Sequence, residues 1–222
     1  MAKKTPDGAA RYHSPLRARQ AAETRRAIIR AATNLFSERG WTATTLPLIA
    51  AEAEVSVDTI YATFGTKSAL MMAVVDVAIV GDDEEAAMVD RPEFARFAEG
   101  ERIERLRTGV HFTVGVYQRS VPILKALQEA AASDEVARAR LAQYDEDRRT
   151  TIVAGLALIL GAPAPDDVVD AVWALGSPEV YTSLTAGRGW SAADTESWLV
   201  DMCSAIFANS ATLQEFSGAA GD

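Results

Sequence analysis

The side chains most often used for catalysis are few and widely spaced in this 222-residue chain. Its two histidines, His13 and His111, and its single cysteine, Cys203, lie too far apart in sequence to indicate a zinc site. The chain contains no phosphate-binding glycine loop, dinucleotide fingerprint or nucleophile elbow. Asp166 and Asp167 are paired carboxylates, but such pairs are unavoidable among 31 acidic residues. The sequence therefore predicts no enzyme, no metal site and no cofactor.

A binding function is indicated instead by the segment 45–64. Thr45 can cap a short helix that tolerates Pro47 in its first turn, and Ser56 can cap a second helix over 57–64. Two short helices joined by a tight turn match a helix-turn-helix, in which the second helix enters the major groove of DNA. An ordinary helical hairpin without a DNA partner has the same periodicity, so periodicity alone leaves both interpretations open.

The charge of the chain is divided unevenly. The net charge is -9, yet residues 1–70 carry 10 basic and 6 acidic side chains, and the remaining residues carry 12 and 25. A basic N-terminal part suits contact with phosphates, although a solvated arginine-rich surface has the same composition. We expect the arm from Lys3 to Arg19 to be flexible, and either to follow a groove of bound DNA or to serve solubility alone.

Apolar residues recur with helical spacing along the chain, and no segment alternates like a strand. The sequence therefore predicts an all-α protein of about nine or ten helices. The first long helix, 20–39, is predicted to stop at Gly40. Ser120 and Pro122 predict a break in the next long helical region, and Ser133 is predicted to cap the helix that follows it.

The C-terminal region predicts two broad apolar helices. The first begins near Pro165 and is kinked or ended by Pro178, and the second begins at a capping box formed by Ser191 and Asp194. Apolar faces this wide favour burial against a second copy of the chain, in a four-helix bundle. Burial of both helices inside one subunit is the alternative.

No segment predicts a membrane partner. The longest uninterrupted apolar stretch, Ile152–Ala162, is shorter than the roughly 20 residues that cross a bilayer. The first residues lack the apolar core of a signal peptide, and one cysteine cannot form a disulfide within the chain. We therefore expect a cytoplasmic location.

The residues from Thr45 to Leu70 resemble the N-terminal DNA-binding region of TetR-type transcriptional regulators. The matching positions are Thr45, Ile49, Ala50, Ala53, Val55, Ser56, Thr59, Tyr61, Phe64, Lys67 and Leu70. Leu35, Phe36 and Gly40 also fit, and the stretch 177–199 looks like one subgroup of these regulators. One departure is Glu54, because the family usually has glycine there.

The resemblance implies a three-helix helix-turn-helix domain followed by a larger helical domain for ligand binding and dimerisation. The implied ranges are a flexible basic arm at 1–18, the DNA-binding domain at 19–66, the ligand-binding and dimerisation domain at 67–215, and a flexible tail at 216–222. The implied function is that of a ligand-responsive regulator, in the first instance a repressor. It binds a palindromic double-stranded operator as a homodimer and is released by a small-molecule effector of unknown identity. A non-catalytic helical scaffold is the alternative, and it would lack sequence-selective DNA binding.

The resemblance also assigns individual side chains to DNA. Those expected to contact phosphates or bases are Thr45, Ser56, Thr59, Tyr61 and Lys67, with Val57 and Asp58 nearest the bases. The carboxylate of Asp58 can accept from a cytosine amino group or cap its own helix. In the larger domain, the surplus of aromatic and polar side chains suggests a ligand pocket. Its candidate residues are His111, Phe112, Tyr117, Tyr144 and Trp173.

Overall fold

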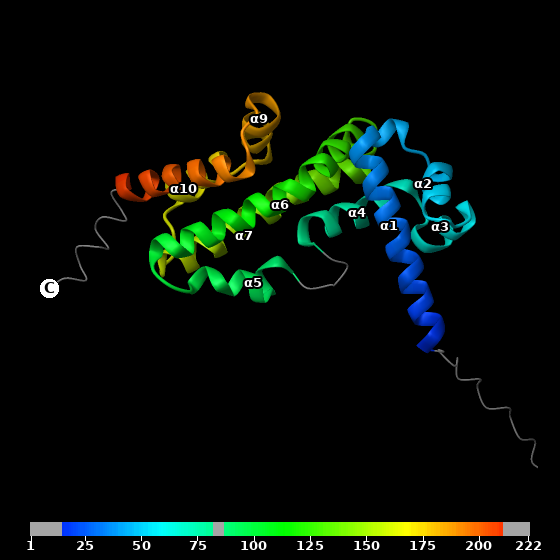
Figure 1. The fold of residues 1–222 in the computed structure, drawn as a ribbon, viewed down its shortest axis with the longest axis horizontal. Helices are drawn as coiled ribbons and strands as arrows, with labels where there is room; N and C mark the ends of the chain where they lie inside the picture. Colours follow the sequence, from blue (N-terminus) through cyan, green and yellow to red (C-terminus); the bar gives the residue numbers. More distant parts are fainter. Residues whose placement is uncertain (1–14, 82–86, 211–222) are drawn as a thin grey trace, which may run out of the picture.

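In the computed structural model, residues 15–81 and 87–210 are described, and every regular element in these ranges is a helix (Figure 1). The N-terminal elements are α1 (Pro15–Ala43), α2 (Leu46–Glu52), α3 (Val57–Phe64) and α4 (Lys67–Val80). The later elements are η1 (Met88–Asp90), α5 (Pro92–Ala95), η2 (Arg96–Ala98), α6 (Arg102–Ala131), α7 (Glu135–Leu160), α8 (Asp166–Leu175), α9 (Pro178–Arg188) and α10 (Ala192–Asn209). The all-α prediction is confirmed.

The long helices α6 and α7 pack side by side through the middle of the molecule. Helix α10 packs on α6 at one end, and α1–α4 gather at the other (Figure 1). Within the described ranges, no single helix has the length and apolar composition to cross a membrane, and the one candidate pair, α3 with α4, is bent by 70° at its break.

Helix α1 begins earlier than predicted, and its helical geometry is interrupted at Gly40, where the sequence predicted a stop. It begins at Pro15, so residues 15–18, which were expected to belong to the flexible arm, are helical; residues 1–14 lie outside the described ranges. Near the other end, Gly40 leaves helical geometry with φ 73° and kinks the chain. The buried Thr44 hydroxyl donates to the carbonyl oxygens of Leu35 and Gly40, which fixes the connection to α2.

One buried cluster joins the four N-terminal helices to the central pair. It contains Ile28 and Phe36 of α1, Ile60 of α3, and Leu70 of α4. The same cluster includes six residues of α6, namely Ile123, Leu124, Ala126, Leu127, Ala130 and Ala131. The expected boundary between residues 66 and 67 therefore crosses a shared core.

The predicted break at Ser120 and Pro122 is wrong, because α6 continues through both residues. Proline removes one backbone donor from a helix, but Ile123 and Leu127, just after Pro122, are fully buried, and their packing holds the helix together. The cap of α7 also differs: an Asp134 carboxylate oxygen accepts from the amide of Ala137 at 2.9 Å, so Asp134 rather than Ser133 is the N-cap.

The predicted C-terminal signals are confirmed. Pro178 ends the first apolar segment by starting a separate helix, α9, whose N-cap is Ser177. Ser191 and Asp194 form the capping box that begins α10. The acidic run at 82–85 and the tail after residue 210 lie outside the described ranges.

A carboxylate from α6 holds the end of α1. The two oxygens of Glu129 accept hydrogen bonds from the backbone amides of Trp41 and Thr42, at 2.8 and 3.1 Å. A Cβ atom at Gly40 would lie only 2.5 Å from a Glu129 oxygen, so this close approach also needs glycine. Hydrogen bonds from Thr42 and Trp41, and the charge of Lys67, lower the pKa of Glu129.

The Glu129 contact predicts a pH-dependent contribution to stability. Because its pKa is lower in the folded state, the carboxylate stabilises the fold above its unfolded pKa, and that contribution is lost as the pH falls through the folded pKa. We expect Glu129→Gln to lower the midpoint of urea unfolding at pH 7 and to differ less from the parent protein near pH 3. Glu38→Gln, at an exposed position of α1, is the control. If Glu129→Gln lowers the midpoint of urea unfolding equally at pH 3 and pH 7, the Glu129 carboxylate does not stabilise the fold in this way.

The turn between α2 and α3 contains a strained backbone at Glu54. This residue has φ 55°, the only positive φ among the described non-glycine residues. Around it, the amide of Val55 bonds to the carbonyl of Ala50 and the amide of Glu54 to that of Ala51, which is a Schellman motif. Glutamate thus occupies the position that normally requires glycine, as the comparison with the family pattern predicted.

Glu54→Gly is expected to raise the free energy of unfolding by about 0.5–1 kcal/mol, because it relieves left-handed strain at some cost in chain entropy. Urea denaturation measures the difference. Glu54→Ala keeps the strain and removes only the carboxylate, so it should leave stability nearly unchanged. If alanine stabilises as much as glycine, the effect belongs to the carboxylate and not to the backbone.

Candidate nucleic-acid interface and internal cavity

Helix α3 is a short, capped helix with one buried side and one exposed side. The Ser56 hydroxyl accepts from the amide of Thr59 at 3.1 Å and lies 2.8 Å from the Thr59 hydroxyl. Ile60 is buried in the shared core and fixes the orientation of the helix. Asp58 and Tyr61 are exposed, with 53% of Tyr61 accessible, so the outward side presents a carboxylate and a phenol.

The other residues expected to contact DNA differ in their exposure and in their roles within the helices. Thr45 is exposed at the start of α2 and makes no side-chain capping bond. Val57 is half-buried against the core, so it is only partly available to bases. Capping of α3 belongs to Ser56, while Asp58 lies in the first turn, where the helix dipole favours its negative charge.

Lys67 is engaged inside the protein. Its ammonium donates to the carbonyl oxygen of Trp41 at 2.5 Å and lies 3.9 Å from the centre of the Trp41 indole. Burial lowers the pKa of Lys67, and the carboxylate of Glu129 acts in the opposite direction. The side chain thus ties the start of α4 to the end of α1, a role that the sequence-based assignment did not include.

Exposed arginines on α1 extend the basic surface beyond the assigned residues. Helix α1 projects past α2 and α3 in Figure 1 and carries Arg17, Arg19 and Arg30 on its exposed sides. Arg25 lies over the ring of Phe64 at 4.7 Å, which joins α1 to the end of α3. The excess of basic residues in the first part of the sequence was the available signal, but its helical placement required the structure.

The larger domain contains a partly open cavity of about 480 Å³. Of the five predicted pocket residues, Phe112, Tyr117 and Tyr144 line it. The rings of Phe94 and Phe97 join that of Phe112 in one aromatic cluster, with centroid separations of 4.6 to 6.4 Å. Sequence reasoning missed Phe94 and Phe97, because the short helices that carry them show no extended apolar period.

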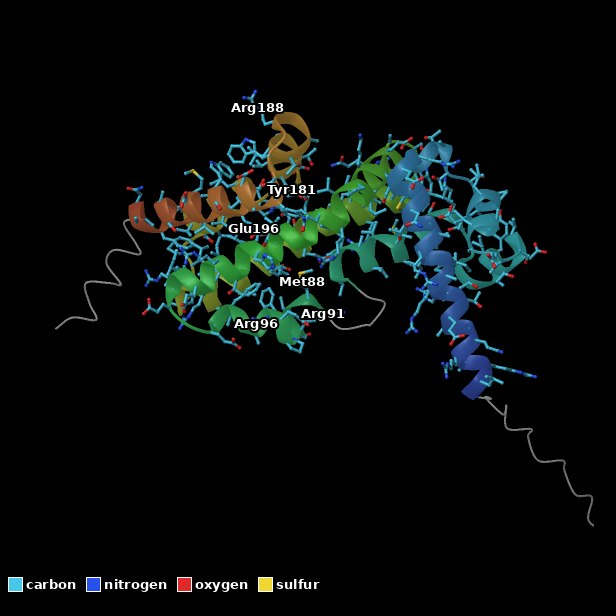
Figure 2. The ribbon with its side chains drawn as sticks, in the orientation of Figure 1. Met88, Arg91, Arg96, Tyr181, Arg188 and Glu196 are labelled. Atoms are coloured by element: carbon cyan, nitrogen blue, oxygen red, sulfur yellow. The ribbon has the colours of Figure 1, made fainter. Side chains whose placement is uncertain are left out.

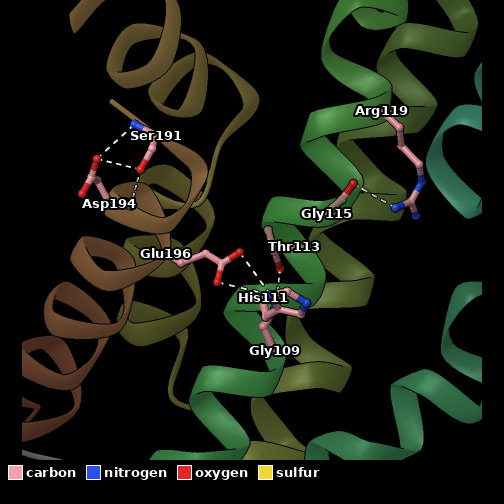
Figure 3. A network of polar contacts seen from close by, with 8 residues as sticks. All are labelled: Gly109, His111, Thr113, Gly115, Arg119, Ser191, Asp194 and Glu196. Carbon is pink, nitrogen blue, oxygen red and sulfur yellow. Dashed lines mark hydrogen bonds and ion pairs between the residues drawn. The ribbon is translucent and has the colours of Figure 1, made fainter. Parts of the chain in front are cut away.

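His111 and Trp173 do not line this cavity, which corrects their assignment to the pocket. His111 is exposed, and its Nδ1 lies 3.1 Å from a carboxylate oxygen of Glu196 on α10 (Figure 3). Trp173 is 36% exposed and packs beneath the guanidinium of Arg148 at 4.4 Å. Figure 2 shows Glu196 beside α6 on the α10 side, whereas Met88, which lines the cavity, lies on the α5 side.

Polar side chains of α7 form one wall of the cavity. Arg140 donates to a carboxylate oxygen of Asp76 at 2.8 Å, and Arg148 donates to the carbonyl oxygen of Trp173 at 2.8 Å. Burial raises the pKa of Tyr117 to about 12 and also raises that of Tyr144, so both phenols stay protonated at neutral pH.

Cys203 lines the same cavity as an unreactive thiol. The side chain is buried, and burial raises its pKa to about 11, which suppresses the thiolate that nucleophilic chemistry needs. Among the described residues, no group of three or more histidine, cysteine, aspartate or glutamate side chains could hold a metal ion. Most of the cavity lining is apolar, which suits it to hold the apolar part of a small molecule.

Comparison with known proteins links this geometry to a family. Residues 28–74 match the model of the tetR family of bacterial regulatory proteins. No curated protein matches the chain in sequence.

Among solved structures, a protein from Mesorhizobium loti assigned to the TetR family of transcriptional regulators has a TM-score of 0.64 at 19% identity. The match covers 85% of this chain and 97% of that protein. A TetR-like transcriptional regulator from Rhodococcus has a TM-score of 0.58 at 18% identity, over 84% and 97% of the two chains. At these identities the likeness concerns the fold. Residues 28–74 are therefore similar to the tetR family of bacterial regulatory proteins, and the described chain shares the fold of these solved structures.

Proposed function

We propose that this regulator is a repressor that binds a palindromic DNA operator as a homodimer and leaves it when a small molecule fills the cavity. The observation that carries the proposal is the combination of an exposed, capped α3 and a partly open cavity in one continuous fold. The protein acts without catalysis and in the cytoplasm.

Helix α4 provides the physical connection between the two sites. At its start, Lys67 bonds to the end of α1, and Ser68 donates to a carboxylate oxygen of Asp134 at 2.5 Å. Towards its end, Asp76 and Ile79 line the cavity. A ligand that binds better when this end of α4 is displaced would therefore shift the population of α3 orientations.

The homodimer is proposed to form through α8 and α10. Along these helices, apolar side chains remain only half-buried within one subunit, among them Leu175, Trp198 and Met202. A two-fold axis would use the same surface twice and bury these side chains against their copies. It would also present two α3 helices to successive major grooves.

Tyr61→Ala is expected to weaken operator binding about three- to tenfold on all bound sequences alike, because a phosphate contact positions the protein without reading bases. Operators are first selected from random duplexes at physiological salt, and affinity is then measured by fluorescence anisotropy across salt concentrations. Tyr61→Phe keeps the ring and removes the hydroxyl, so it shows whether operator affinity depends on a hydrogen bond from the hydroxyl or on packing of the ring. Wild-type affinity in a folded Tyr61→Ala protein would contradict the placement of α3. Failure to select any sequence would favour the scaffold alternative.

The paired change Leu175→Glu and Met202→Glu is expected to give a folded monomer with weakened operator binding, because charges in an apolar interface lose their hydration. Light scattering gives the mass, and circular dichroism checks the fold. Ser197→Glu, at an exposed position of α10, is the control and should remain dimeric. A doubly charged protein that stays dimeric would place the interface elsewhere.

A further inference from the structure

The cavity has chemically distinct walls. On α7, polar side chains recur every three or four residues and therefore share one face; these are Arg140, Tyr144, Asp147, Arg148 and Thr151. Elsewhere the lining is apolar and includes the rings of Phe94, Phe97 and Phe112. A molecule that fills the cavity must therefore combine a polar group with an apolar body.

The polar wall offers hydrogen-bond donors. The Nε atom of Arg148 and one terminal nitrogen of Arg140 are buried without a hydrogen-bond partner among the described residues. Tyr144 adds a protonated phenol on the same face of α7. Because buried donors without partners cost free energy, a ligand with acceptor oxygens would gain stability if a small rotation of these arginine side chains brought the nitrogens to the cavity surface.

The charges of this wall distinguish its two arginines. Arg140 has carboxylate partners, with Asp76 at 2.8 Å and Asp147 at 3.8 Å. Arg148 instead contacts two backbone carbonyls, the hydroxyl of Tyr117 and the ring of Trp173. No carboxylate of the described residues lies within ion-pair distance of it. Its charge is left for an anion to neutralise.

Asp76 and Asp147 line the cavity and carry negative charge, but both pair with Arg140. Two further negative influences act against an anion, and neither removes the preference of Arg148 for one. Glu179 on α9 raises the pKa of both Tyr117 and Tyr144, so its charge reaches this end of the cavity, but its side chain is exposed to solvent. The net charge of -9 is spread over the whole chain. Electrostatic energy falls with distance and with solvent screening, so a guanidinium in direct contact outweighs both.

We propose that the effector is a monocarboxylate with an alkyl or aryl body, whose carboxylate binds Arg148 and Tyr144 and whose body lies among the three phenylalanine rings. The inference rests on the proposed function, in that it assigns the chemistry of the molecule expected to fill this cavity. The volume of about 480 Å³ lies in the range of pockets that enclose compounds of this kind.

Isothermal titration with decanoate and 4-phenylbutyrate tests the ligand class directly on the DNA-free protein. Each carboxylate is compared with its neutral amide, and decanoate also with decyltrimethylammonium. We expect the carboxylates to bind at least about tenfold more tightly than the amides, because hydrogen bonds to charged groups are the stronger ones. Binding should also raise the midpoint of thermal unfolding, because the ligand binds the folded protein only.

Arg148→Gln should weaken carboxylate binding about ten- to a hundredfold and leave amide binding nearly unchanged. Arg149→Gln is the matched control, because Arg149 pairs with Asp170 and does not line the cavity. Arg148 also holds the end of α8, so Tyr144→Phe provides a second variant that removes one hydroxyl only. It should weaken carboxylate binding about three- to tenfold.

The proposal would be overturned if the protein bound carboxylates and amides with equal affinity, or if it preferred the ammonium compound. It would also be overturned if Arg148→Gln and Arg149→Gln lost the same amount of affinity for carboxylates. These binding experiments can succeed or fail independently of the proposed function as a repressor. Carboxylate binding that raises the unfolding midpoint but leaves operator affinity unchanged would support the ligand class and contradict the release mechanism.

Discussion

The end of α6 packs into the same buried cluster as α1, α3 and α4, and this contact determines how α3 is held. Ile123 and Leu127 supply the apolar part of the contact. Glu129 supplies the polar part by accepting from the backbone at the kink of α1. Because closely packed interiors transmit displacement instead of absorbing it, a change in α6 or α4 near the cavity has a direct route to α3.

In the N-terminal domain, some polar side chains of the motif bond within the protein and others remain exposed. Ser56, Thr59 and Lys67 are all polar and all match the family pattern, yet the first two bond to each other and the third bonds to Trp41. Tyr61 and Asp58 are left as the exposed side chains of α3. The polar surface that α3 leaves exposed is thus smaller than the motif suggests, and exposed arginines of α1 carry positive charge that α3 lacks.

Most of the fold could be predicted from the sequence because its signals are local. Ser56 and Ser191 cap helices, Gly40 kinks one, and Glu54 takes the turn conformation expected of the glycine it replaces. Pro122 was misread because the burial of Ile123 and Leu127, which keeps α6 intact, is a tertiary effect. His111 was misplaced for a similar reason: its neighbour Phe112 lines the cavity, while His111 turns towards α10. The spacing of apolar residues shows which side of a helix is buried, but it does not show which other element packs against that side.

A hydroxyl-radical footprint of the protein on a selected operator tests the central claim most directly. A dimer that reads DNA with two α3 helices should protect two equivalent half-sites whose centres lie about 10–10.5 base pairs apart, or a multiple of that spacing, on one face of the duplex. An occupant of the cavity should abolish both protections together. Protection of one unsymmetric stretch, or no protection by a protein shown to be folded, would contradict the account.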